Sequence, residues 1–281
     1  MIAKSFIDEH RLSNRKACAL VGMSRSQFNY TSRKKEDSNI VRSIIEIKER
    51  YPSYGVPRVL ATLRRRGFVI NAKKVYRIMK TLRLQVPKKR KAKSKFRSVR
   101  SNVPVTSQVG DVWSMDFIFD RLKNGSSFRC LTIVDNLSRE VPGIFVSKSM
   151  SGFLPIDFLD LLRRKTNLPK HIILDNGTEF ANDIFVNWCT RNKINLHFID
   201  PGKPVQNAYI ESFNGKFRQE FLSANEFTTI AEVRRKLKSW VYYYNNERPH
   251  SSLDYMTPKE FAVMQTNVLD QKNNLLVLKT G

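Results

Sequence analysis

The sequence predicts an α/β protein in which an all-α front region of helix-turn-helix type precedes a mixed β-sheet covered by helices. Three observations lead to this prediction. The first hundred residues contain short helices with apolar periodicity, separated by serine caps and glycine stops. The later part contains three strands joined by short turns, followed by strands that alternate with helices. Charge divides the chain at the same place: residues 1–100 hold 28 Lys and Arg against 6 Asp and Glu, and residues 101–281 hold 22 against 19.

Composition indicates a folded chain without a membrane segment. The 281 residues are 41% hydrophobic and include 18 Phe, which is enough apolar material for one or two domains with substantial cores. No stretch approaches the roughly 18 consecutive apolar residues of a membrane helix, and the N-terminus lacks the apolar core of a secretory signal. We therefore expect a cytoplasmic protein. The three cysteines form no CxxC pair, so we expect buried thiols.

Basic charge is concentrated at the front of the chain. The counts above give a net charge of +22 for residues 1–100 and +3 for residues 101–281. A basic module joined to a nearly neutral body is typical of proteins that bind a polyanion, and nucleic acid is the commonest such partner. We therefore expect the basic region to bind nucleic acid, with double-stranded DNA as the expected partner.

Residues 1–36 are predicted to form a first helix-turn-helix segment. Ser13 or Asn14 can cap a helix, a glycine ends that helix, and Ser24 can cap a second short helix. This order of helix, glycine turn and capped helix has helix-turn-helix spacing. We predict that Arg25, which follows the second cap, contacts DNA.

Residues 37–86 are predicted to form a second unit, which has three helices and is also of helix-turn-helix type. Pro57 suits a first helical turn, Gly67 suits a helix end and Asn71 can cap the last helix. Alone, this unit fits a generic basic bundle as well as a DNA-binding module, but two such segments on one strongly basic stretch favour DNA binding. On the last helix, the residues expected to contact DNA are Lys73, Lys74 and Arg77.

Residues 87–108 are predicted to be a basic linker. Residues 87–100 carry eight basic side chains and no acid, so this stretch cannot bury itself in a core. We expect it to be disordered or to be ordered by DNA. The linker residues expected to contact DNA are Lys88, Lys89, Arg90 and Lys91.

Residues 109–250 are predicted to form the α/β domain, and residues 251–281 a C-terminal tail. The predicted order of elements in the domain is three strands, a helix, a strand, a helix, a strand and two helices. Short turns join the first three strands, whereas helices separate the later ones. This order predicts a mixed sheet with helices packed on its faces.

An acidic residue lies in the middle of the first strand of this domain. Asp116, in the stretch WSMDFIF, shares a strand face with Ser114 and Ile118. A lone aspartate inside an apolar strand is unfavourable unless it is paired or bound to a metal ion. Asp116 is therefore a candidate site residue.

Two further carboxylates occur at the ends of predicted elements. Asp175 follows the fourth strand directly, in HIILDNG, and Glu211 lies on the first turn of a later helix. Each has an ordinary explanation when it is taken alone, since Asp175 can open an Asx turn and Glu211 suits the helix dipole. On that helix, Glu211, Asn214 and Arg218 share one face.

Three carboxylates on separate rigid elements suit two-metal phosphoryl transfer. Mg²⁺ prefers oxygen ligands and keeps several waters, so two or three carboxylates suffice when a phosphate supplies further oxygens. Two ions about 4 Å apart activate the attacking water or 3′-hydroxyl and stabilise the leaving oxygen. The predicted cofactor is Mg²⁺, with two ions and with Mn²⁺ as a substitute. We expect Arg218 to contact a phosphate near this site.

Four motifs, in this order, carry a resemblance to a known family: WSMDF, ILDNGTEF, FIDPGKPVQNAYIESFNGKFRQEF and YYNNERPHSSLDYMTP. Between Asp175 and Glu211 lie 35 residues. Together these features resemble the downstream-frame product of the IS3 insertion-sequence family, a DDE transposase of the retroviral-integrase-like superfamily with a ribonuclease H fold. The stretch YPSYGVPRVLATLRRRGFVINAKKVYRIM is similar to the helix-turn-helix before the catalytic core, so the resemblance covers essentially the whole chain.

The resemblance implies a function and roles for particular residues. By position, Asp116, Asp175 and Glu211 become the catalytic triad that binds the metal ions. The implied reaction is metal-dependent cleavage at insertion-sequence ends followed by strand transfer from the freed 3′-hydroxyl. The implied partners are the terminal inverted repeats, the target DNA and further copies of the chain on DNA. The family also implies an upstream-frame segment with a leucine zipper, as partner or fusion, and no heptad repeat appears here.

Two other functions agree with parts of the sequence. A regulator could bind DNA and keep the fold without catalysis, but such a protein would have no reason to retain three acids. A ribonuclease H-like or resolvase-type nuclease would keep the metal ions without strand transfer. The basic helix-turn-helix front favours recognition of specific DNA ends over this alternative.

Other polar residues near these motifs are interpreted as structural. His197 is expected to be a satisfied core histidine, and Arg248 and His250 are expected either to contact DNA or to anchor the tail. The acids interpreted as solvent or turn residues are Asp111, Asp120, Asp135, Glu179 and Asp183.

Overall fold

The structure is a computed structural model. It describes residues 2–29, 37–87, 104, 106–148, 153–177, 179–200 and 204–277. The chain divides into two compact units, Met1–Arg50 and Tyr51–Gly281.

The first unit is helical. Ser13 caps one helix by accepting a hydrogen bond from the Lys16 amide, and Ser24 caps the next through the Gln27 amide. Gly22 supplies the turn between them, with a φ of 66° that favours glycine. The predicted pair of capped helices is present, whereas α1 was not predicted because no capping residue precedes it. The helices are α1 (Ile2–His10), α2 (Asn14–Leu20), α3 (Arg25–Phe28) and α4 (Ser38–Arg50).

The second unit begins with two helices that pack against each other, α5 (Val56–Arg65) and α6 (Ala72–Thr81). Gly67 follows α5 with a φ of 85°, and Asn71 caps α6 by accepting a hydrogen bond from the Lys74 amide at 2.8 Å. The predicted helix end and helix cap are therefore both confirmed. The fully buried apolar residues of the two helices are Val59, Leu63, Val75 and Met79.

A five-stranded mixed sheet follows, with strand order β3-β2-β1-β4-β5. The first three strands pair antiparallel because short turns connect them, and the last two pair parallel because a helix precedes each of them. The predicted order of strands and helices is confirmed. The elements are β1 (Val112–Arg121), β2 (Ser127–Asp135), β3 (Ile144–Ser147), α7 (Leu154–Arg163), β4 (His171–Leu174), α8 (Asp183–Arg191) and β5 (Asn195–Phe198).

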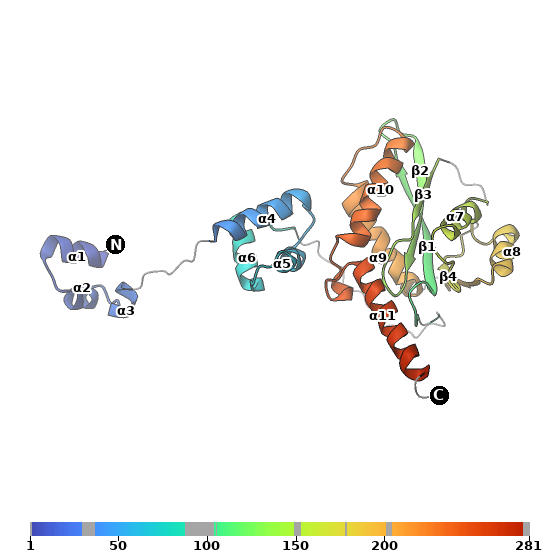
Figure 1. The fold of residues 1–281 in the computed structure, drawn as a ribbon. Coiled ribbons are helices and arrows are strands. Elements are labelled where there is room, and N and C mark those ends of the chain that lie inside the picture. Colours follow the sequence, from blue (N-terminus) through green and yellow to red (C-terminus); the bar gives the residue numbers. More distant parts are fainter. Residues whose placement is uncertain are drawn as a thin grey trace. The chain divides into compact units, whose positions relative to one another are not determined.

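Helices cover both faces of the sheet (Figure 1). Alternation along β1 separates two cores, since Met115 packs on the side of α7 and α8 while Ile118 packs on the side of α9 and α10. The fold is the ribonuclease H-like arrangement that was predicted. The later elements are η1 (Pro204–Asn207), α9 (Ala208–Phe217), η2 (Arg218–Leu222), α10 (Ile230–Asn246), η3 (Ser251–Leu253) and α11 (Pro258–Val277).

Helix α9 runs directly into one π-helical turn, η2. Three phenylalanines along this run, Phe213, Phe217 and Phe221, are buried and stack in sequence against Trp240 of α10. This aromatic core holds α9 on the sheet. The three cysteines are buried and unpaired, as predicted. In the described part of the chain, no helix has the length and apolar character needed to cross a membrane.

Candidate active site

Asp116 lies at the centre of the sheet. It is on β1, opposite Thr132 of β2, and its side chain is half-buried. Its Oδ1 accepts a hydrogen bond from the Phe117 amide at 2.7 Å. The backbone of the same strand therefore fixes one of the two carboxylate oxygens of Asp116.

Asp175 is brought beside Asp116 by the pairing of β1 and β4. The parallel register pairs Ser114 with Ile173, and Asp175 follows the end of β4 two residues later, on the side toward which β1 continues to Asp116. Asp175 Oδ1 also accepts a hydrogen bond from the Gly177 amide at 3.1 Å, which is the Asx turn expected from the sequence. The turn role and the site role of Asp175 are therefore compatible.

Glu211 lies on the first turn of α9, with an exposed side chain. The opposite side of α9 is buried through Ile210 and Phe213, and the helix packs on β1 and β2. Glu211 therefore lies on the side of α9 that is not buried, one turn before Asn214, whose side chain contacts Asp116. The predicted face of Glu211, Asn214 and Arg218 is present.

Asn214 links α9 to the strand that carries Asp116. Its Nδ2 donates a hydrogen bond to Asp116 Oδ2 at 2.6 Å. The Thr132 hydroxyl lies 2.9 Å from both the Asn214 Oδ1 and the Asp116 carbonyl oxygen, so it can donate to either. Thr132 is fully buried. These contacts were not predicted from the sequence. The only indication was that Asn214 lies three residues after Glu211, on the same face of the helix.

The negative charges of Asp175 and Glu211 act on the Asp116 carboxyl group. The pKa of Asp116 is raised to about 6, mainly by burial and also by the charges of Asp175 and Glu211, against hydrogen bonds from Phe117 and Asn214 that lower it. Within the described residues, no group of three or more His, Cys, Asp or Glu side chains is arranged to hold a metal ion. The electrostatic effect on Asp116 does not require the acids to be within ligand distance of one ion, because charges act over longer distances than metal–ligand bonds of about 2.0–2.1 Å.

The loop after Asp175 is fixed on the β1–β2 hairpin. Phe180 is fully buried and stacks on Phe117, with the ring centroids 4.8 Å apart. Glu179 accepts a hydrogen bond from Arg129 Nη1 at 2.9 Å. Glu179, interpreted as a solvent or turn residue, therefore belongs to an ion pair that ties the loop to β2.

Arg218 is exposed, seven residues after Glu211. Its Nη2 lies 3.5 Å from the carbonyl oxygen of Phe119, a long contact that leaves most of its donors unused. A cation is therefore present on the same helix face as Glu211, as the sequence predicted.

The predicted DNA-binding residues lie on several segments. On α6, Lys73 and Arg77 are exposed and Lys74 is partly exposed, all on the side opposite the buried Val75 and Met79. Arg25 is exposed on α3 in the first unit. The linker residues Lys88, Lys89, Arg90 and Lys91 lie outside the described part of the chain.

Two interpretations from the sequence need correction or completion. His197 is not a core residue, because it is half-buried on the edge strand β5, where its Nε2 lies 2.9 Å from His171 Nδ1. Arg248 and His250 are buried at 1% and 3% exposure, so they anchor the chain and do not present their side chains to DNA. Burial of Arg248 could not be read from a motif rich in polar residues.

Family models match two successive parts of the chain. Two models described as Integrase core domain match residues 106–204 and 192–258. A model described as HTH-like domain matches residues 34–92. These matches cover the sheet with the three candidate acids and the segment that contains α4, α5 and α6.

Proteins of insertion elements are similar over nearly the whole chain. A 31.7 kDa protein of insertion element IS407 from Burkholderia multivorans is 36% identical, over 92% of this chain and 94% of that protein. A 39.2 kDa protein of insertion element IS476 from Xanthomonas euvesicatoria is also 36% identical, over 99% and 80% respectively. The putative transposase InsK for IS150 from Escherichia coli is 27% identical, over 84% and 89%.

A solved structure has the same fold at low sequence identity. A chain of the simian T-cell lymphotropic virus intasome, solved in complex with PP2A regulatory subunit B56 gamma, matches with a TM-score of 0.52 and 18% identity. The match covers 78% of this chain and 74% of that one. Sequence and fold together show that the chain belongs to the IS3 family of insertion-sequence transposases, within the retroviral-integrase-like superfamily, and that its function is DNA transposition and recombination.

Proposed function

We propose that this transposase cuts DNA at insertion-sequence ends and joins the freed 3′-hydroxyl to target DNA, with Asp116, Asp175 and Glu211 as its metal-binding triad. One observation carries the proposal: the Asn214 hydrogen bond attaches the helix of Glu211 to the Asp116 carboxylate. The parallel pairing of β1 with β4, which ends just before Asp175, agrees with it.

The donor chemistry of the triad fits a hard divalent cation. All three side chains offer carboxylate oxygens, which Mg²⁺ and Mn²⁺ prefer. The raised pKa of Asp116 reflects burial beside two other negative charges, a situation that a bound cation would relieve. When bound, a pair of such ions polarises the phosphate and makes the attacking water or hydroxyl more acidic. Asp116, Asp175 and Glu211 are the residues that would hold them.

The chain's own side chains supply orientation and positive charge around this site. Asn214 holds one oxygen of Asp116, so the carboxylate has one preferred orientation before substrate binds. Arg218 lies on the same helix face as Glu211 and has donors for a DNA phosphate. The Arg129–Glu179 pair holds the loop that carries Asp175.

DNA recognition is assigned to the basic front of the chain. The exposed side of α6 offers Lys73, Lys74 and Arg77 to phosphates or base edges, in the manner of a recognition helix. Arg25 and the linker residues 88–91 add positive charge that is not specific for sequence. We further propose that copies of the chain assemble on the terminal repeats, with an upstream-frame segment as an additional partner.

A strand-transfer assay tests the triad. Labelled DNA carrying the element's own terminal repeats is incubated with Mg²⁺ or Mn²⁺ and either wild type, Glu211→Gln or Glu226→Gln. Glu226 is a matched control, because it is 82% exposed and pairs only across the surface with Lys123. Joined product is expected from wild type and the control and none from Glu211→Gln.

Other outcomes contradict particular parts of the proposal. Joining by Glu211→Gln at the wild-type rate would remove Glu211 from the triad. Cleavage without joining by wild type would favour a nuclease. Specific binding of ends without cleavage, even after the upstream segment is added, would favour a DNA-binding role. Because Glu211 is exposed, the variant should unfold at the wild-type temperature, which separates loss of activity from loss of fold.

A further inference from the structure

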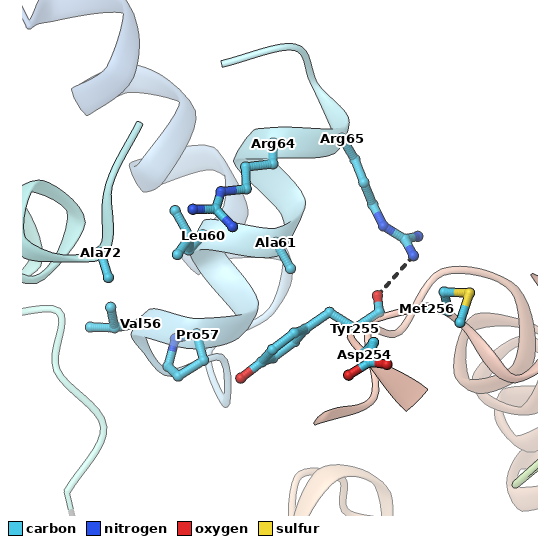
Figure 2. A pocket seen from close by; sticks show the side chains of 10 residues that line it. All are labelled: Val56, Pro57, Leu60, Ala61, Arg64, Arg65, Ala72, Asp254, Tyr255 and Met256. Carbon is cyan, nitrogen blue, oxygen red and sulfur yellow. Dashed lines mark hydrogen bonds between the residues drawn. The ribbon is translucent and has the colours of Figure 1, made fainter. Parts of the chain in front are cut away.

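Residues 51–65 contact the C-terminal part of the core, and both belong to the second unit. Figure 2 shows one end of this contact, where Arg65 of α5 reaches the loop around Tyr255. Arg65 Nη2 donates hydrogen bonds to the Tyr255 carbonyl oxygen at 2.9 Å and to Glu260 Oε2 at 2.6 Å. We call the set of interactions between residues 51–65 and Glu220, Tyr243, Glu247, Tyr255 and Glu260 the docking contact.

The centre of the docking contact is a buried carboxylate. Glu220 accepts two hydrogen bonds from Arg248, at 2.7 and 2.8 Å, and one from Arg58 Nη1 of α5 at 3.1 Å. The side chains of Glu220 and Arg248 are 6% and 1% exposed. The His250 ring lies 3.3 Å from Arg248 Nη1, on the far side of the guanidinium. The YNNERPH motif therefore provides the arginine that holds Glu220 in place for Arg58.

Aromatic rings form the other end of the docking contact. Tyr51 stacks on both Tyr54 and Tyr243, with centroid distances of 4.7 and 5.0 Å. The hydroxyls of Tyr54 and Tyr243 are 3.1 Å apart, and the Tyr51 hydroxyl donates to Glu247 at 2.6 Å. Each of the three glutamates in the docking contact, Glu220, Glu247 and Glu260, thus accepts a hydrogen bond from a donor on residues 51–65.

The docking contact is built so that it can open. Glu220 keeps Arg248 when Arg58 leaves, and Glu260 also accepts a hydrogen bond from the Thr257 amide, so neither carboxylate becomes a buried unpaired charge. Arg65 and Glu260 are 35% and 50% exposed. A pocket of about 520 Å³ remains between α5 and residues 254–256, lined by apolar side chains and by Arg64, Arg65, Asp254 and Tyr255 (Figure 2). Polar, partly exposed contacts of this kind are typical of reversible interfaces.

The docking contact joins two parts with different tasks. Helix α5 packs on α6, which carries the basic residues assigned to DNA recognition. Glu220 lies nine residues after Glu211 on the continuous helical run of α9 and η2. The π-helical turn that contains Glu220 ends this run, and Phe221 of the same turn packs against Trp240 of α10. Arg58 therefore ties the recognition helix pair to the helix that carries a triad residue.

We propose that the docking contact fixes the recognition helix relative to the triad, so that Arg58, Arg65 and Glu220 act as positioning residues that set which phosphate is cut. This inference rests on the proposed function of the triad and of α6. The basic linker between α6 and β1 is long enough to let the two move apart when the contact is broken, since residues 88–103 would span tens of ångströms if extended. Binding of DNA ends should then survive while the position of the cut is lost.

The test replaces both arginines of α5 by glutamine in the full chain, as Arg58→Gln/Arg65→Gln. Both residues lie on the α5 side, so the buried Glu220–Arg248 pair remains intact and the variant should fold. Arg191→Gln is the matched control, because Arg191 is an exposed arginine at the end of α8 and lies outside the docking contact. A conservative rescue, Arg58→Lys/Arg65→Lys, restores the charge.

Three quantities are measured on labelled terminal-repeat DNA with Mg²⁺: end affinity, the distribution of cut positions and the amount of joined product. For the double glutamine variant we expect end affinity within about threefold of wild type, cuts spread over neighbouring phosphates, and joining reduced at least tenfold. The control should cut at the wild-type position, and the lysine variant should return most cuts to it. Cuts by the glutamine variant at the single wild-type position would overturn the inference.

Hydrogen exchange separates a failure of this inference from a failure of the proposed function. Faster exchange in both α5 and residues 243–256 of the glutamine variant, with the sheet unchanged, is expected if the docking contact exists in solution. Unchanged exchange would show that it does not. If wild type cuts no DNA under any condition, the role in positioning falls with the proposed function, and the exchange result alone decides whether α5 docks.

Discussion

Replacing Asn214 by alanine tests whether this amide orients the Asp116 carboxylate. The variant loses the 2.6 Å hydrogen bond to Asp116 Oδ2 and the 2.9 Å contact with the Thr132 hydroxyl. A hydrogen bond to a charged group contributes about 1.5–3 kcal/mol to stability. Alanine has the better helix propensity and returns about 0.5 kcal/mol. The free energy of unfolding should therefore fall by about 1–2.5 kcal/mol, measured by urea denaturation.

The effect of the same variant on activity should exceed its effect on stability. Removing the outer partner of a metal-binding side chain typically lowers metal affinity or activity about 10–100-fold. We expect strand transfer at fixed Mg²⁺ to fall by this factor, and the Mg²⁺ concentration for half-maximal activity to rise. Asn246→Ala is the control, because Asn246 is exposed on α10 and its side chain donates to the Tyr242 carbonyl of the same helix. It should leave both values unchanged.

The reasoning is refuted by one combination of results. If Asn214→Ala keeps the wild-type rate across the whole Mg²⁺ titration while it loses stability, Asn214 contributes to the fold and does not orient Asp116. A loss of activity that is the same at every Mg²⁺ concentration would instead indicate a role beyond the binding of metal.

Three other perturbations test neighbouring parts of the structure. Phe180→Ala, which removes a fully buried ring stacked on Phe117, should lower the free energy of unfolding by about 3–5 kcal/mol in urea denaturation, and Phe180→Leu by less. Burial raises the pKa of Glu220, but hydrogen bonds and charge from Arg248 and Arg58 outweigh it and hold the pKa below the ordinary 4.5. This ion pair therefore stabilises the fold above pH 4.5 and is lost as the pH falls through the lowered pKa, so the difference in the free energy of unfolding between wild type and Glu220→Gln should narrow as the pH falls below 4.5. Arg77→Gln should weaken end binding in an affinity titration and, if Arg77 contacts a phosphate, reduce the slope of log affinity against log salt by about 1.

Much of the fold was predictable because its signals are local. Serine and asparagine caps at Ser13, Ser24 and Asn71 are recognisable wherever a side-chain oxygen can reach an amide three residues ahead. The mixed character of the sheet followed from connection length, since short turns favour antiparallel neighbours and helical crossovers permit parallel ones. Helix α1 was missed because it lacks such a cap.

The candidate site was predictable only in part. Asp116, Asp175 and Glu211 were identified from their placement at points where local structure does not call for acid, together with the family resemblance. The Asn214–Asp116 hydrogen bond joins residues 98 positions apart, and no local pattern reports such a contact. The same limit applied to Glu220 and Arg248, whose pairing depends on how the turn η2 packs against the end of α10.

The sequence by itself determined most of the helices and all five strands, where basic charge concentrates and which three acids are candidates for catalysis. These properties depend on side-chain type and on periodicity along the chain, so they can be predicted without knowledge of the tertiary contacts. Only the tertiary structure decided that Arg248 is buried against Glu220, that Asn214 holds Asp116 and that α5 docks on the core. Contacts of this kind depend on the free energy of packing distant segments together, which no single segment carries in its sequence.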